Sequence, residues 1–203
     1  MLNTNQKIEH LRKLGFNGDF EQIERMYNGE KFDVRDEEYR RLLQLSKEYC
    51  MRFTQLSELI SRAKSAEEIE KYNKEKSEIL DNLFPGHGAI YGCGDGLFAI
   101  IGTVKIGNDV SVGDHITLAG NITIGDRAKL GRRVVLQTTG HEVNYKGRKI
   151  TADSKGNVCE ISTPGFIIVR PEIILADGTK VIPDQTVKRN TKKDEIVTNS
   201  RDD

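Results

Sequence analysis

The sequence predicts a mainly β protein, a hexapeptide-repeat parallel β-helix preceded by a helical segment. Aliphatic residues recur at every sixth position through the middle of the chain, and small or turn-forming residues follow them. The 203 residues include 19 Gly and no Trp, and only 6% are aromatic. A β-helix has a narrow interior that single Ile, Val and Leu side chains fill, with glycine at its turns, so the composition agrees with the repeat.

The N-terminal part of the chain is expected to be helical and charged. A long helix is indicated by apolar residues at intervals of three and four, which lie on one stripe: Leu42, Leu45, Tyr49, Phe53, Leu56 and Ile60. Ser65 with Glu68 three positions later is a capping box that opens a second helix, which would end before Pro85. The inward residues of that helix would be Ile69, Tyr72, Ile79 and Leu83. Shorter helices are expected over 7–14 and 20–27.

Beyond these helices the apolar residues follow a period of six. One series consists of Ile106, Val112, Leu118, Ile124, Leu130 and Leu136. A second series runs two places ahead of it, with Val104, Val110, Ile116, Ile122, Ala128 and Val134. Gly, Asn and Asp lie between the units, where coil corners need positive φ. A period that holds its phase through six units predicts stacked coils rather than an accidental β meander.

The repeat is interrupted once. Residues 137–165 are polar, and the hexads resume in a new phase with Ile167, Val169, Ile173, Leu175, Val181 and Val187. The interval from Leu136 to Val169 is 33 residues, which is not a multiple of six. We therefore predict a helical domain over 1–85, a β-helix over 86–190 with an inserted loop at about 137–165, and a solvated tail over 191–203. Loops of that length are usually functional or disordered.

Charge and composition exclude several classes of protein. Lys plus Arg and Asp plus Glu each number 31, so the chain lacks the basic excess of a general nucleic-acid binder. The longest apolar run, 97–101, is far shorter than a membrane span, and the first residues lack the apolar core of a signal peptide. Three cysteines without a CxxC motif argue against a disulfide framework or a thiolate zinc site. We expect a cytoplasmic protein that binds neither nucleic acid nor membrane.

The candidate chemistry rests on four histidines. His10 lies in a polar helix and His87 in a turn, and we interpret both as surface residues. His115 falls at a coil corner, and His141 stands where the regular coil ends and the insertion begins. An imidazole at the start of an inserted loop can act as a general base near neutral pH. A zinc site needs three good ligands, so we expect no metal. No G-x-S-x-G elbow or P-loop occurs.

Two segments resemble the galactoside and maltose O-acetyltransferases, which belong to the left-handed β-helix acyltransferases. The first is the step Thr139-Gly140-His141-Glu142-Val143 at the mouth of the insertion. The second is Glu24-Arg25-Met26-Tyr27-Asn28-Gly29-Glu30-Lys31-Phe32-Asp33, which is similar to the opening motif of that family. The similarity covers about 20–190, and the TGH step is the part that indicates catalysis.

The resemblance implies an acetyl-CoA-dependent sugar O-acetyltransferase that coils in the left-handed sense. It implies a homotrimer with active sites between neighbouring subunits. His141 would be the general base for direct transfer, and Asp33 and Glu142 would contact the sugar. The family carries an Asn where this chain has Gly113, so His115 would replace that contact. Lys188 and Arg189 would face the phosphates of CoA.

The chain also departs from the family pattern. The closing Gly-x-Pro-Ala-Lys step and the Trp-bearing hexad are absent, and fewer hexads follow the insertion. A non-catalytic β-helix that scaffolds or binds a partner therefore stays open as an alternative. N-acetyl transfer to an aminosugar is a further alternative, because one imidazole can serve either nucleophile.

Overall fold

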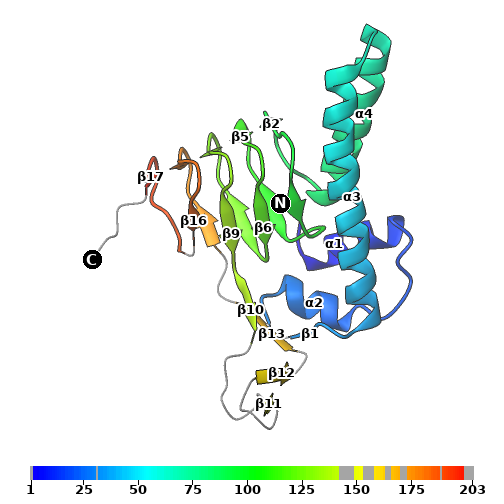
Figure 1. Cartoon of the computed structure of the whole chain (residues 1–203), viewed down its shortest axis with the longest axis vertical. Coiled ribbons are helices and arrows are strands. Elements are labelled where there is room, and N and C mark those ends of the chain that lie inside the picture. The colour runs from blue at the N-terminus through cyan, green and yellow to red at the C-terminus, as the bar shows by residue number, and fades with distance from the viewer. Residues whose placement is uncertain are drawn as a thin grey trace.

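The computed structural model describes residues 2–30, 32–141, 149–152, 158–162, 166–169, 173–187 and 189–198. A group of helices stands at one end of a three-sided solenoid of short parallel strands (Figure 1). One hydrophobic cluster of buried residues runs through both parts. The predicted mainly β architecture with a helical N-terminal segment is confirmed. Among the described helices, none combines the length and the apolar character that a bilayer crossing requires.

Four helices precede the solenoid: α1 (Thr4–Lys13), α2 (Glu21–Tyr27), α3 (Glu37–Arg62) and α4 (Ala66–Leu83). Ser65 caps α4 as predicted, since its side chain accepts from the Glu68 N–H, whereas the Glu68 carboxylate accepts from the Lys64 N–H. The prediction that Ile69 faces inward is wrong, because its side chain is 38% exposed. Helices α3 and α4 form a hairpin that projects beyond the solenoid (Figure 1), and Ile69 lies near its free end, where the coils do not cover it.

The solenoid has three faces, each a parallel sheet with one strand per coil. Face 1 contains β2 (Ile90–Tyr91), β5 (Val110–Val112), β8 (Lys129–Leu130), β15 (Lys180–Val181) and β17 (Ile196–Val197). Face 2 contains β3 (Phe98–Ala99), β6 (Thr117–Ala119), β9 (Val135–Gln137) and β16 (Thr186–Val187). Face 3 contains β4 (Val104–Ile106), β7 (Ile122–Ile124) and β14 (Ile173–Leu175).

Both predicted aliphatic series point into the solenoid. All twelve residues are buried, from Val104 and Ile106 to Val134 and Leu136. Equivalent residues stack at a spacing of eighteen, as when Leu118 pairs with Leu136, so three hexads make one coil. At the corners, non-glycine residues adopt positive φ, among them His115 at 58°.

The predicted β-helix began at residue 86, but the hexad series starts only at Val104 and did not predict the strands of the first coil. Strands β2 and β3 precede Val104 and pair with β5 and β6, and the segment with Gly92 and Gly96 forms the corner between them. Ile90 pairs with Val110, twenty residues later, so this coil is longer than the regular coils of eighteen residues and lacks the hexad phase.

The insertion leaves the solenoid in the third coil, between face 2 and face 3. Leu136 pairs with Val187, fifty-one residues later, so the chain between them carries thirty-three residues more than one coil. We call the strands of this insertion the arm: β10 (Thr139–His141), β11 (Lys149–Ala152), β12 (Val158–Ser162) and β13 (Phe166–Val169). In Figure 1 the arm extends away from the coils.

Pairing within the arm corrects one prediction. Ile167 and Val169 were expected to resume the coil, but β13 is antiparallel to β10, with Val169 opposite Thr139. The coil resumes instead at Ile173, which pairs with Ile122. The predicted tail over 191–203 also includes a coil strand, because β17 stacks on β15.

The helices close the first coil through specific contacts. Tyr27 donates its hydroxyl to the Ile101 carbonyl at 2.8 Å, and burial raises the pKa of that phenol. The Ser46 hydroxyl accepts from the Ile101 N–H at 3.2 Å. The Asn121 amide donates to the Met26 carbonyl at 3.0 Å, so the end of α2 lies along the corner between faces 2 and 3. This is the corner from which the arm departs.

Candidate functional site

His141 is the last residue of β10, in a small sheet that brings distant segments together. The sheet has the order β1-β13-β10, in which β1 is the short strand Phe32–Asp33. His141 pairs with Ile167, and Ile167 pairs with Phe32. The backbones of His141 and Phe32 are therefore two strand spacings apart, roughly 10 Å. The structure thus places Asp33 and His141, the predicted sugar contact and the predicted base, in one sheet.

Asp33 is held by its own loop. Its carboxylate accepts from the Arg35 guanidinium at 3.0 and 3.1 Å and from the Arg35 N–H at 2.9 Å. These bonds lower the pKa of Asp33, so the carboxylate is charged at neutral pH. The Asp33 N–H donates to the Gln22 side chain at 2.8 Å, which fixes the strand against α2. A ligand at this position meets a carboxylate and a guanidinium as a pair.

The residue before β10 carries an unusual polar group. Thr138 is completely buried, and its N–H donates to the Ala119 carbonyl as the coil requires. Its hydroxyl has no hydrogen-bond partner among the described residues. An unpaired buried hydroxyl costs about 1–3 kcal/mol, and such groups are rare in folded proteins.

His115 lies at a different corner, between faces 1 and 2. It is exposed, its N–H donates to the Asp95 carbonyl at 2.6 Å, and its ring lies close to Gly96. Face 2 separates this corner from the one that carries His141. Within one chain the structure therefore does not bring His115 and His141 together.

The remaining predicted contacts divide into two groups. Glu142 and Lys188 lie outside the described residues. Arg189 donates to the Glu195 carboxylate at 2.7 Å and to the Asn190 carbonyl at 3.1 Å, and its bond lowers the pKa of Glu195. An anionic ligand of Arg189 would have to compete with this carboxylate.

The other histidines and two of the cysteines have structural partners. His10 contacts the Asn82 carbonyl at 3.0 Å, and His87 contacts the Gly88 carbonyl and Asp81. Burial raises the pKa of Cys50, and it raises that of Cys93 to about 12, so both thiols are protonated at neutral pH. Within the described part of the chain, no three His, Cys, Asp or Glu side chains are grouped as metal ligands would be.

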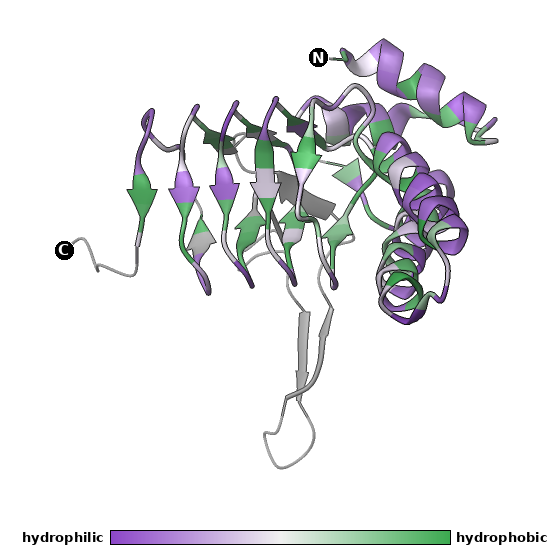
Figure 2. Ribbon diagram, turned by 90° about the horizontal axis from the view of Figure 1, so that it is seen from above, coloured by the Kyte–Doolittle hydropathy of each residue, from purple (hydrophilic) through white to green (hydrophobic). Residues whose placement is uncertain are grey.

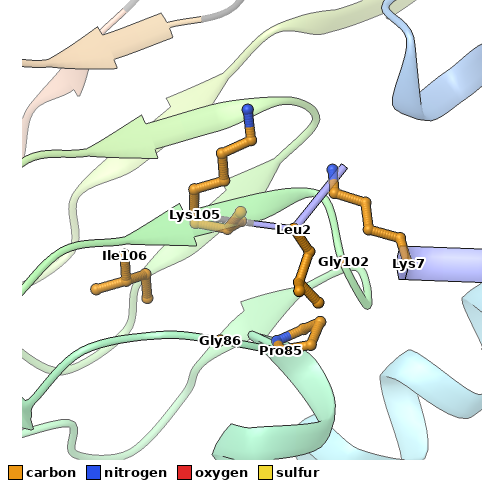
Figure 3. Close-up of a pocket in the computed structure, with 8 residues that line it drawn as sticks. Leu2, Lys7, Pro85, Gly86, Gly102, Lys105 and Ile106 are labelled. Atoms are coloured by element: carbon orange, nitrogen blue, oxygen red, sulfur yellow. The ribbon is translucent and has the colours of Figure 1, made fainter. Parts of the chain in front are cut away.

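Two hollows were not found by sequence reasoning. A groove of about 440 Å³ lies between α3 and the start of face 2, lined by Lys47, Cys50, Met51, Thr54, Gln55, Gly96, Leu97 and Phe98. The spacing of the helical members by three and four is the signal that could have indicated it. The second hollow, between Leu2, Pro85 and Gly102 (Figure 3), has about 10 Å³ and so admits at most one water.

Comparison with known proteins places the fold. No protein-family model matches the chain, and no curated protein matches it. It is similar to a hexapeptide-repeat-containing acetyltransferase of Vibrio cholerae O1 biovar eltor, crystallised with acetyl coenzyme A, at 16% identity and a TM-score of 0.53. The match covers 86% of this chain and 91% of that one. A maltose O-acetyltransferase of Clostridium difficile 630 gives 16% identity and a TM-score of 0.51, over 86% and 90% of the two chains.

These similarities cover the helices as well as the coils. They confirm the fold that the sequence and its resemblance predicted, a left-handed parallel β-helix with a helical N-terminal segment.

Proposed function

We propose that this protein is an acetyl-CoA-dependent O-acetyltransferase that acts on a hydroxyl of a sugar or sugar-containing acceptor. The observation that carries the proposal is the position of His141, at the start of an arm that pairs with the segment of Asp33. The two similar structures are acetyltransferases, and one is named for maltose. Assay of a sugar panel with acetyl-CoA, with detection of the free thiol, tests the proposal.

His141 would act as general base in direct transfer. It would accept the proton of the acceptor hydroxyl while that oxygen attacks the thioester carbonyl. The C–S bond then breaks, and the proton passes to the leaving thiolate, which yields an acetyl ester and free CoA. Backbone N–H groups beside the arm would stabilise the oxyanion. Asp33, with Arg35, and Glu142 would orient the sugar.

The same solenoid would form a homotrimer. The outward side chains Phe98, Thr117 and Val135 of face 2 are uncharged and stand in one row over three coils. The cores of protein interfaces are depleted of charged residues, so this uncharged row suits contact with another protein surface. Such contact would allow His115 of one subunit to approach the arm of another, as the substrate role proposed for it requires. We place the protein in the cytoplasm, in keeping with the free thiols of Cys50 and Cys93.

Charges introduced on face 2 should separate the subunits. We expect the variant T117E/V135E to elute as a monomer, because two buried carboxylates per contact are strongly unfavourable. Light scattering coupled to gel filtration measures the mass. The variant S111E/T123E places the same charges on faces 1 and 3 and should keep the wild-type mass. A wild-type monomer, or an unchanged T117E/V135E oligomer, contradicts this assignment of the interface.

Lys188 and Arg189 would bind the phosphates of CoA. Because Glu195 competes for Arg189, we expect Glu195→Gln to bind CoA several-fold more tightly and Arg189→Ala more weakly. The rise in unfolding temperature on addition of CoA measures both affinities, since a ligand at 100 times its Kd stabilises the folded protein by about 2.7 kcal/mol. Glu67→Gln, at an exposed position of α4, is the control. If millimolar CoA leaves the unfolding temperature unchanged, the non-catalytic scaffold is the better description.

A further inference from the structure

Face 1 carries a straight row of outward side chains that the proposed chemistry does not use. In-register pairing aligns them one per coil: Tyr91, Ser111, Lys129, Lys180 and Ile196. Tyr91, Lys129, Lys180 and Ile196 are exposed. The residues that follow Ser111, Lys129 and Lys180 point inward and are buried: Val112, Leu130 and Val181. At one strand spacing per step the row is roughly 19 Å long.

Two ammonium groups stand side by side in this row. Lys129 and Lys180 are direct partners on β8 and β15, which Figure 2 shows as adjacent hydrophilic arrows. Like charges on neighbouring strands repel and destabilise a sheet. No ion pair of either lysine occurs among the described residues, so the repulsion is not relieved by a carboxylate of that part of the chain.

The acidic groups of these coils are engaged elsewhere. Asp126 accepts from the Asn108 N–H at 2.7 Å, and Asp177 accepts from the Asp126 N–H at 3.0 Å. Asp184 binds Arg133, and Glu195 binds Arg189. These bonds hold the corners of successive coils together. The carboxylates therefore stay at the corners and leave the lysines of the row uncompensated.

Two further cations flank the lysine pair. Arg127 and Arg132 lie at the two ends of β8, both are exposed, and neither has an ion pair within the described residues. At the other end of the row the Tyr91 ring is 56% exposed, and its hydroxyl donates to Asp109 at 3.3 Å. The row thus offers, in order, the flat ring of Tyr91, the hydroxyl of Ser111 and the ammonium groups of Lys129 and Lys180.

This order suits a chain of sugars that carries spaced negative charges. A sugar ring has an apolar face that can lie on an aromatic ring, and its carboxylate can bind an ammonium group. A nucleic acid fits less well, because its negative charges are much more closely spaced than the single lysine pair of the row can match. We infer that face 1 binds an acidic oligosaccharide, of the uronate class, across successive coils. The inference goes beyond the proposed function, because face 1 lies opposite the corner that carries the arm and glycan binding there does not require acetyl transfer.

Binding to a short oligogalacturonate, measured by calorimetry without acetyl-CoA, tests the inference. The wild type should bind this probe and not a neutral maltodextrin of equal length, and added salt should weaken the binding. The variant K129A/K180A should bind roughly tenfold more weakly, because two exposed ionic contacts are lost. Its unfolding temperature should be equal to or above the wild-type value, because the repulsion is removed.

The control is K13A/K74A, which removes the same charge from exposed positions on α1 and α4 and should bind as the wild type. Equal binding by K129A/K180A and the wild type would overturn the inference. So would binding of a single-stranded oligo-dT as tight as that of oligogalacturonate. His141→Ala should retain glycan binding, so that failure of acetyl transfer and failure of glycan binding are separate results.

Discussion

Replacement of His141 by Ala should lower kcat/KM for acetyl transfer by about 10²–10⁴-fold, which is the usual contribution of a general base. The wild-type rate should fall at acidic pH, because only a neutral imidazole can accept the hydroxyl proton. The variant should lack this acidic limb. Initial rates over a pH series, followed through the released thiol, measure both effects.

The matched control for this experiment is His10→Ala, since His10 lies on the helical segment, where its ring contacts the Asn82 carbonyl. Circular dichroism and CoA binding of the His141 variant should equal those of the wild type, which would assign the loss to chemistry rather than folding. Turnover by His141→Ala within threefold of the wild type would refute its role as general base and assign the proton transfer to another group.

Phe32→Ala should have the largest effect on stability, a loss of about 3–5 kcal/mol in the free energy of unfolding. Phe32 is only 1% exposed, packs on Tyr39 with ring centroids 4.9 Å apart, and anchors β1 beside β13. The substitution leaves a cavity under the strand that carries Asp33. Urea denaturation, with the same slope assumed for both proteins, measures the change.

Phe32→Leu is the conservative control and should cost less than half as much, since it retains most of the buried volume. At a temperature where both variants are folded, Phe32→Ala should also show a higher KM for the sugar. A loss below 1 kcal/mol for Phe32→Ala would mean that β1 is not anchored by this side chain, contrary to its burial.

The sequence was sufficient for the coils because their packing is local and periodic. Ile106 and Leu118 are buried for the same reason as every other member of their series, so one period predicts them all. The hexads did not predict the strands of the first coil because its corners are longer: Ile90 and Phe98 are twenty and nineteen residues from their partners, which breaks the phase. The inward position predicted for Ile69 is wrong because the helical period identifies the apolar side of a helix. It does not show where the helical hairpin extends beyond the solenoid.

The candidate site was only partly predictable. The position of His141 at the start of the insertion was enough to select it as a candidate. Nothing local in the sequence shows that β13 turns back to lie between β10 and β1. That pairing joins segments more than a hundred residues apart. Likewise, the bonds that hold Asp33 to Arg35 and Arg189 to Glu195 depend on loop conformations. The row on face 1 depends on strand register. The hexads indicate how the inward residues of the coils stack, but they do not show which charged side chains become neighbours on the outer face.

The position of the arm has a consequence for the order of folding. Pairing of β7 with β4 closes eighteen residues, whereas pairing of β14 with β7 closes fifty-one. Loop-closure entropy makes the longer closure about 1 kcal/mol more costly. Non-local contacts of this kind also form late. The helices and the first two coils therefore provide the natural nucleus, and the C-terminal coils, with the proposed CoA contacts, join after the arm has folded back.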